Sequence, residues 1–415
     1  MTFEEEFRAL LKSQPGAVIL NQVRMAMDDS PSVDAFGQLR TSSPYTAFEI
    51  THQYDLGPRL MGLQKNDSGT SIVHTAPAAV LSVPSTSGRR ICHQSHRYIV
   101  YQPGRSHIVR MTGQLGSGSI LAGMGYGDDS DGVFLERTNT GMQIRLSSST
   151  IPDQLVSQSS WNVDKMDGSG VSGIQLNPGM SQHLVIDFQW LGVGRVRVGF
   201  SVDGKTHYAH YFHFSNEIVG TYTRTGSLPI RWYAESIGTA GSMSALCASV
   251  SAESGHDAFG QLFSYASATT KALGSAGVRT PLFSIRPKLL YAGLPNYTHI
   301  IPFDVPALVA AADNVLLEMV ADGSLTGDTF AVVPNALSHA EIDTAATAIS
   351  NGVVIHSEYL SSQVRISLST SEAFDAKIRP LTIRANGTDR DVLTVCGTRI
   401  GGAASVFAGM NWLEV

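Results

Sequence analysis

Residues 183–214 alternate apolar and polar side chains with a period of two residues. This is the period of a β-strand with one buried face, and one-sided burial is typical of antiparallel sheets. Arg195 and Arg197 fall on the face opposite the apolar one. Residues 191–194 and 203–204 lie between the alternating segments, where tight hairpins need positive φ. The pattern predicts a β-meander whose buried face consists of Ile186, Phe188, Trp190, Val196, Val198 and Phe200.

The same alternation returns toward the C-terminus, for example at residues 363–368. Between the two strand-rich parts, residues 256–275 are small, polar and glycine-rich, which is typical of a linker. We therefore predict an all-β fold with two antiparallel β-sandwich (jelly-roll-like) domains at residues 31–255 and 276–415, preceded by a short N-terminal helical segment. Within the second domain, residues 340–350 are predicted as one short helix.

Residues 1–30 differ from the rest of the chain because their apolar side chains recur at helical spacing. Pro15 and Gly16 interrupt this pattern, so two short helices are expected. An amphipathic helix pair ahead of a β-rich body either packs on its own domain or docks on another subunit as an arm. The candidate partner-binding residues of such an arm are Phe3, Phe7, Leu10, Leu11, Leu20, Val23 and Met27.

The composition of the chain excludes several classes of partner. Only 15% of the 415 residues are charged, against about 25% in typical soluble domains. This composition suits a β-protein whose surface is partly covered by neighbouring subunits. The net charge of −6 gives no general attraction to nucleic acid.

No segment reaches the roughly 18 consecutive apolar residues of a membrane helix, and the acidic N-terminus is unlike a signal peptide, so cytoplasmic synthesis without membrane insertion is expected.

One hexapeptide, DAFGQL, occurs twice, at residues 34–39 and 257–262. Duplicated sandwich domains, each introduced by the same segment, would explain the repeat. Two equivalent docking strips would also explain it. The flanking residues diverge quickly, and the structural explanation is favoured.

Residues 161–179 contain a glycine-rich stretch, 168–173, that matches the pattern G-x-G-x-x-G. A dinucleotide site needs a helix directly after this pattern, but the residues that follow predict a strand fragment ending at Pro178 and Gly179. We therefore interpret the stretch as a turn between strands, and no cofactor is predicted.

Residues 127–132 carry three aspartates, Asp128, Asp129 and Asp131. An EF-hand loop would need a carboxylate six positions after the glycine and helices on both sides, and neither is present. An acidic hairpin turn is the favoured interpretation, with an irregular Ca²⁺ site as the alternative.

The histidine spacing predicts no metal site. On a strand at residues 207–213, His207 and His213 fall on one face and His210 falls on the other, so the three imidazoles cannot converge locally. His93 and His96 are likewise expected on opposite faces. No arrangement of serine, cysteine and histidine at a known catalytic spacing is present, and no catalytic residue is predicted.

The three cysteines, Cys92, Cys247 and Cys396, lie far apart and form no C-x-x-C pair. They are expected to be small buried thiols. The most basic stretch, residues 87–97, is expected to be an exposed strand end. The core is expected to contain the tryptophans Trp161, Trp190, Trp232 and Trp412.

Several sequence blocks resemble a widespread family of tailed-bacteriophage virion structural proteins. The blocks cover residues 33–49, 97–107, 125–136, 161–178, 188–204 and 228–235. Met166 stands where the family pattern has Leu, which leaves a turn intact. The resemblance implies a non-enzymatic virion component built on β-sandwiches, made in the host cytoplasm and assembled with other virion structural proteins. A homo-oligomer, trimer or higher, is expected.

Three functional hypotheses follow from the sequence. The first is a tail-associated structural protein of a fibre, collar or baseplate. The second is a capsid decoration or cement protein. The third is an adhesin that binds a host-surface glycan, because β-sandwiches often bind ligands on sheet faces or loops. Glycan binding is compatible with either virion role.

Overall fold

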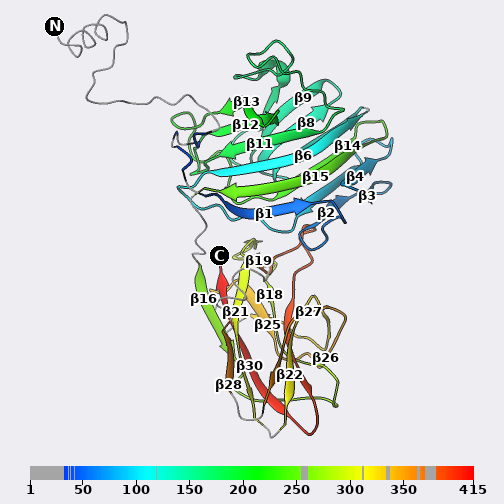
Figure 1. Cartoon of the computed structure of the whole chain (residues 1–415), viewed down its shortest axis with the longest axis vertical. Helices are drawn as coiled ribbons and strands as arrows, with labels where there is room; N and C mark the ends of the chain where they lie inside the picture. The colour runs from blue at the N-terminus through cyan, green and yellow to red at the C-terminus, as the bar shows by residue number, and fades with distance from the viewer. Residues whose placement is uncertain are drawn as a thin grey trace, which may run out of the picture.

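The computed structural model describes residues 32–35, 37, 39–41, 43–117, 119–253, 260–310, 313–332, 337–361, 365–369 and 380–415. In these residues the regular secondary structure is almost entirely β-strand, arranged as two antiparallel β-sandwiches (Figure 1). The predicted all-β fold class is confirmed. The predicted N-terminal helical segment and its candidate partner-binding residues lie outside the described residues. None of the described segments forms a helix that could span a membrane.

The first sandwich contains an eight-stranded sheet in the order β13-β12-β11-β6-β15-β4-β3, with β1 also paired to β15. Every strand pair in it is antiparallel. Its strands are β1 (Tyr45–Thr51), β3 (Ser71–Thr75), β4 (Ala78–Val83), β6 (His107–Ser117), β11 (Gln182–Phe188), β12 (Val196–Val202), β13 (Lys205–Phe212) and β15 (Gly241–Ala252).

A seven-stranded sheet in the order β10-β9-β8-β7-β14-β5-β2 faces it across the core. Its strands are β2 (Met61–Asn66), β5 (Arg90–Ser95), β7 (Ile120–Gly127), β8 (Gly132–Thr138), β9 (Gly141–Ser147), β10 (Gln154–Ser157) and β14 (Ile230–Ser236). A single 3₁₀ turn, η1 (Gln158–Ser160), follows β10.

The predicted meander forms strands β11, β12 and β13 of the eight-stranded sheet. The hairpin between β12 and β13 turns at Asp203 and Gly204, whose φ values are +50° and +76°. Both residues of a two-residue hairpin of this type need positive φ, which explains the Asp-Gly pair. The predicted inward side chains of β11 and β12 are buried. Trp190, after β11, is only half-buried and donates its indole N–H to Thr223.

The second sandwich has its own pair of antiparallel sheets. The five-stranded sheet contains β16 (Gln261–Ala266), β17 (Lys271–Ala272), β21 (Ile300–Val309), β28 (Arg365–Ser369) and β30 (Ser405–Glu414). The six-stranded sheet contains β18 (Thr280–Pro287), β22 (Val315–Ala321), β24 (Ala331–Val332), β25 (Ala340–Asp343), β27 (Val353–Leu360) and β29 (Leu393–Arg399). Two short ribbons pair β19 (Leu290–Tyr291) with β20 (Leu294–Pro295), and β23 (Ser324–Thr326) with β26 (Ala348–Ser350).

Two predictions for this part of the chain differ from the structure. Residues 261–266 and 271–272 pair with β30, so this part of the predicted 256–275 linker is strand within the second sandwich. The helix predicted at residues 340–350 is wrong, because this segment forms β25 and β26. Asp343 ends β25 and accepts the backbone N–H groups of Ala345 and Ala346, which turns the chain.

Each sandwich has a separate hydrophobic core. Trp161 and Trp232 are buried in the first core and Trp412 in the second, as predicted. The two sandwiches also contact each other directly. The rings of Tyr98 and Tyr297 stack with centroids 3.7 Å apart, and the backbone N–H of Ala385 donates to Nδ1 of His96 over 3.0 Å.

Candidate functional site

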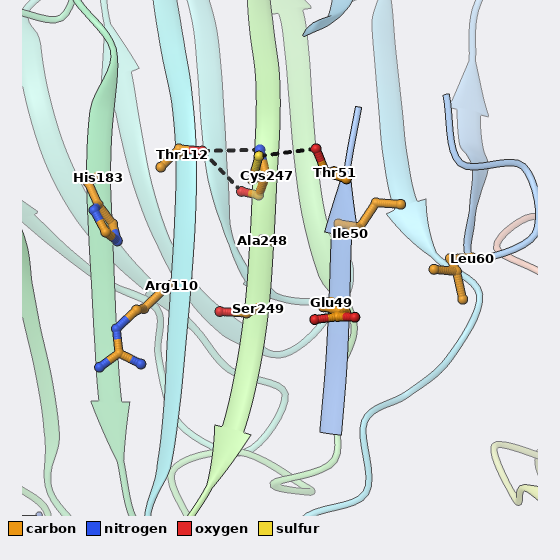
Figure 2. A pocket seen from close by; sticks show the side chains of 10 residues that line it. All are labelled: Glu49, Ile50, Thr51, Leu60, Arg110, Thr112, His183, Cys247, Ala248 and Ser249. Carbon is orange, nitrogen blue, oxygen red and sulfur yellow. Dashed lines mark hydrogen bonds between the residues drawn. The ribbon is translucent and has the colours of Figure 1, made fainter. Parts of the chain in front are cut away.

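A groove of about 660 Å³ lies on the outer face of the eight-stranded sheet (Figure 2). Four neighbouring strands, β11, β6, β15 and β1, form its floor. Their alternate side chains fill the core on the opposite side, so the polar side chains of the groove face outward. The residues that line it are Glu49, Ile50, Thr51, Leu60, Arg110, Thr112, His183, Cys247, Ala248 and Ser249.

The strand register places the groove side chains in two adjacent rows that run across the strands. The first row consists of His183, Thr112, Cys247 and Thr51. The second row consists of Val185, which is buried and does not line the groove, followed by Arg110, Ser249 and Glu49. Neighbouring strands lie about 4.8 Å apart, so each row of four spans about 14 Å. The groove therefore presents a polar array formed by residues that are distant in the sequence, from Glu49 to Ser249.

Thr112 and Cys247 are held together in the first row. The Thr112 hydroxyl accepts the backbone N–H of Cys247 over 3.1 Å and lies 3.3 Å from the Cys247 carbonyl, to which it donates. The Cys247 thiol lies 3.6 Å from the hydroxyl of Thr51. Three of the four residues in the first row are therefore linked by hydrogen bonds.

The exposure of Cys247 contradicts the prediction of a buried thiol. A register shift between Ala245 and Cys247 in the pairing of β15 with β6 inserts one extra residue, Leu246. Such a bulge reverses which side chains face the core. Ala245 before the bulge and Ala248 after it are both buried, and Cys247 is turned outward.

The other two cysteines, Cys92 and Cys396, are buried as predicted. Burial raises the pKa of the Cys92 thiol to about 11 and that of the Cys396 thiol to about 12. Both thiols are therefore protonated at physiological pH.

The charges of the groove are separated along the second row. The Arg110 guanidinium lies toward β11, on the same side as His183, and Glu49 lies beyond Ser249 on the far side (Figure 2). Partial burial and the neighbouring guanidinium of Arg110 lower the pKa of His183. Near neutral pH the imidazole is therefore uncharged and offers one donor and one acceptor.

A buried ion-pair network lies on the same sheet face, next to the groove. Arg197 lies on the outer face of β12, as predicted, yet it is 0% exposed. Its guanidinium donates to Asp187 over 2.5 Å and to the carbonyl of Val33 over 2.7 Å. Arg40 forms ion pairs with both Asp187 and Glu253. The described residues of the segment 32–40 therefore form a strap that covers these charges.

The first copy of the hexapeptide repeat lies in this strap. Val33 and Leu39 pair as an isolated bridge, and the N–H of Gly37, at φ +81°, donates to the carbonyl of Asp34 over 3.0 Å. The described residues of the hexapeptide thus close a tight turn. Only the last three residues of the second copy, 260–262, lie within the described part of the chain.

The glycine-rich stretch at 161–179 forms a hydrogen-bonded turn, as predicted. The Asp164 carboxylate accepts the backbone N–H groups of Met166 over 2.8 Å and Ser172 over 2.7 Å. A Cβ at Gly170 would overlap this carboxylate, which explains the glycine. No helix follows in the described residues.

The aspartates of residues 127–132 form a hairpin turn between β7 and β8. The Asp128 carboxylate accepts the N–H groups of Ser130 and Asp131, and Arg224 forms ion pairs with Asp128 and Asp131. Within the described residues, no cluster of three or more His, Cys, Asp or Glu side chains is arranged to hold a metal ion.

The histidines of β5 and its C-terminal end contact different partners. His93 meets His52 inside the first core, with their Nε2 atoms 3.2 Å apart, and His96 contacts the second sandwich. The prediction that residues 87–97 form an exposed strand end is wrong beyond Arg90, since β5 lies between β14 and β2 and residues 91–96 are buried.

The outer face of the seven-stranded sheet carries a second polar cluster. Glu136 on β8 accepts hydrogen bonds from Tyr233 and Gln143 and pairs with Arg145. The Tyr233 ring reaches Glu136 because Gly123 lies between them on β7 and a Cβ there would overlap the ring. This carboxylate is fully bonded within the protein.

Comparisons with known proteins identify no family. No family model matches the chain, and no curated protein matches it. Among solved structures, the Emp47p carbohydrate recognition domain is 14% identical, with a TM-score of 0.31, and the match covers 50% of this chain and 96% of that domain. Peanut lectin is 8% identical at a TM-score of 0.33, covering 51% of this chain and 98% of the lectin. A protein of unknown function from Shewanella oneidensis MR-1 is 10% identical at a TM-score of 0.32, covering 61% of this chain and 95% of that protein. At these TM-scores the matches do not establish a shared ligand.

Proposed function

We propose that this protein is a non-enzymatic binding protein whose first sandwich binds a glycan in the groove on its eight-stranded sheet. The observation that carries the proposal is the polar array of two adjacent rows on an outward sheet face. Saccharide hydroxyl groups both donate and accept hydrogen bonds, so a complementary site needs both kinds of partner side by side.

The groove offers such partners together with an apolar floor. The hydroxyls of Thr51 and Ser249 can donate and accept, and the carboxylate of Glu49 accepts. The Thr112 hydroxyl donates its proton to the Cys247 carbonyl, so toward a ligand it can only accept. Leu60 and Ile50 supply apolar surface at the β1 end of the groove (Figure 2). A mostly apolar concave surface with a few placed polar groups is the usual composition of a ligand site.

An open groove of this kind binds a single saccharide weakly. Each direct hydrogen bond contributes about 1 kcal/mol net, so four or five of them give about 4–5 kcal/mol, which corresponds to a Kd on the order of 0.2–1 mM. Linking several such sites raises the overall affinity without any new contact. Weak single sites therefore agree with the homo-oligomer, trimer or higher, expected from the sequence.

The proposal includes no catalysis. Glycoside hydrolysis by the usual mechanism needs two carboxyl groups flanking the scissile bond. Among the described residues that line the groove, Glu49 is the single carboxylate. Glu136, on the other sheet, is held by three partners.

A virion role is the second part of the proposal, and the resemblance to tailed-phage structural proteins supports it. All the blocks that carry the resemblance lie between residues 33 and 235, within the first sandwich and its strap. Several of them supply the strap, the hairpin turns and Arg197. We propose a tail-associated component made in the host cytoplasm, with a host-surface glycan as ligand, and a capsid decoration protein as the alternative.

The test is binding of the purified full chain to an immobilised saccharide panel, compared with two matched variants. Ser249→Tyr places a large ring in the centre of the groove, and we expect it to abolish binding. Ser71→Tyr introduces the same ring at an exposed position on the edge strand β3, and we expect binding to be unchanged. Equal binding by both variants, or no binding by the native chain, would refute the proposal.

A further inference from the structure

Arg110 carries the charge of the groove that no described residue neutralises. Its guanidinium stays protonated at any physiological pH. The Arg110 guanidinium forms no hydrogen bond or ion pair with any of the described residues. In its row, the neighbours of Arg110 are Val185 on β11 and Ser249 on β15, and neither is charged.

The carboxylates nearest to Arg110 along the sheet are either bonded elsewhere or too distant. Asp187, on β11 in the adjacent row, binds Arg40, Arg197 and Tyr208. Glu253 is engaged by Arg40. Glu49 lies in the same row as Arg110 but two strands away, which is about 10 Å.

Arg110 differs in this respect from two other arginines on the same sheet face, which are paired with carboxylates. Two arginines under and within the strap, Arg197 and Arg40, each have a carboxylate within 2.5 Å. Arg110 is half-buried on the same face but is left open toward the groove. A partly desolvated guanidinium binds a carboxylate strongly, because its planar fork donates two parallel hydrogen bonds.

We propose that the saccharide bound by the groove is acidic, and that Arg110 binds its carboxylate. The inference rests on the proposed function and adds the class of the ligand. The neutral imidazole of His183 lies on the same side of the groove and supplies a further hydrogen bond (Figure 2). Glu49, at the opposite end of the row, accepts hydroxyl donors and disfavours a second acidic group at that end. The charge pattern thus gives the saccharide one orientation in the groove.

The experiment uses uronate and sialate oligosaccharides, each paired with its carboxyl-reduced neutral counterpart. The Kd of the full chain is measured for both members of each pair, together with Arg110→Gln and the matched control Arg89→Gln, which alters an exposed arginine before β5. We expect the native chain to bind at least one acidic member about 10- to 100-fold more tightly than its neutral counterpart, as for a charged hydrogen-bonded pair. Arg110→Gln should remove this difference and still bind the neutral member, and Arg89→Gln should keep it. Increasing salt should reduce the preference.

The outcomes separate the two proposals. If the native chain binds saccharides and Arg110→Gln leaves the acidic preference intact, or no preference exists, the acidic ligand is refuted and glycan binding stands. If no saccharide binds, both proposals fail. If Arg110→Gln changes the oligomeric state in sedimentation while saccharide binding is unaltered, the groove is a contact between copies of the chain, and the acidic ligand is refuted. Circular dichroism and thermal unfolding verify that each variant is folded.

Discussion

The paired imidazoles inside the first core make its stability depend on pH. His93 on β5 is 2% exposed, and its Nε2 lies 3.2 Å from Nε2 of His52. Nδ1 of His52 donates to the carbonyl of Leu246 over 2.8 Å, so its Nε2 accepts the proton of His93. Burial, followed by the neighbouring His52 and His96, lowers the pKa of His93 from 6.5 to about 3. Both imidazoles are therefore neutral in the folded protein at physiological pH.

The sign of the effect follows from proton binding. The unfolded chain protonates His93 below pH 6.5, whereas the folded chain does so only near pH 3. The unfolded state thus binds more protons in this window, and the free energy of unfolding falls as the pH falls from 6.5 toward 3. One pKa unit corresponds to about 1.4 kcal/mol, so about 2 kcal/mol is lost between roughly pH 6.5 and pH 5. Most carboxylates titrate below about pH 5 and contribute little in this interval.

We expect His93→Gln to reduce this loss by about 2 kcal/mol, because the amide keeps a hydrogen bond to His52 and does not titrate. The assay is urea unfolding followed by tryptophan fluorescence between about pH 5 and pH 7, the interval in which an ordinary imidazole titrates. Trp161, Trp190 and Trp232 belong to the first sandwich, and Trp412→Phe would remove the signal of the second. An unfolding free energy with the same pH slope in His93→Gln and in the native chain would refute the reasoning.

Three further changes have defined outcomes. Asp187→Asn leaves the buried Arg197 without its carboxylate. We therefore expect the unfolding free energy of the first sandwich, measured in urea, to fall by about 3–5 kcal/mol. A decrease below about 1 kcal/mol would contradict the stabilising role of the ion-pair network under the strap. Gly123→Ala places a methyl group against the Tyr233 ring and should cost about 1–3 kcal/mol, whereas Gly402→Ala, whose Cβ would meet only Asp313 at 3.9 Å, should be nearly neutral in the same assay. Tyr98→Ala removes the stacking on Tyr297 and should broaden the distribution of inter-sandwich orientations in small-angle scattering; an unchanged profile would show that other contacts hold the two sandwiches.

Local pattern predicted the meander strands of the first sandwich because the core-facing side chains of β11 and β12 recur at every second position. The alternation of Val196, Val198 and Phe200 appears unchanged in β12, and the Asp203–Gly204 hairpin follows directly from the need for positive φ. The prediction of a helix at residues 340–350 was wrong. Local propensity in a run of small residues is weak, and pairing with β18 and β23 decides the conformation.

Local sequence pattern could not predict the candidate site. Its rows join Glu49 to Ser249 and Arg110 to Val185, and these pairings depend on the register of four strands distant in the sequence. The bulge at Leu246 that turns Cys247 outward leaves no mark in the local composition. The candidate partner-binding residues of the N-terminal segment, by contrast, lie outside the described residues and stay a prediction.

The sequence by itself determined that this chain forms antiparallel sandwiches, because side-chain alternation and glycine-containing turns act over a few neighbouring residues. Tertiary structure alone decided which outward side chains are free and which are covered. Arg197 and Arg110 have equivalent positions in the alternation, yet Arg197 is paired with Asp187 and covered by the strap, whereas Arg110 is left open to the groove. Charge compensation depends on distances in space, and residues far apart in the chain supply it here: Arg40 reaches Asp187 across 147 positions.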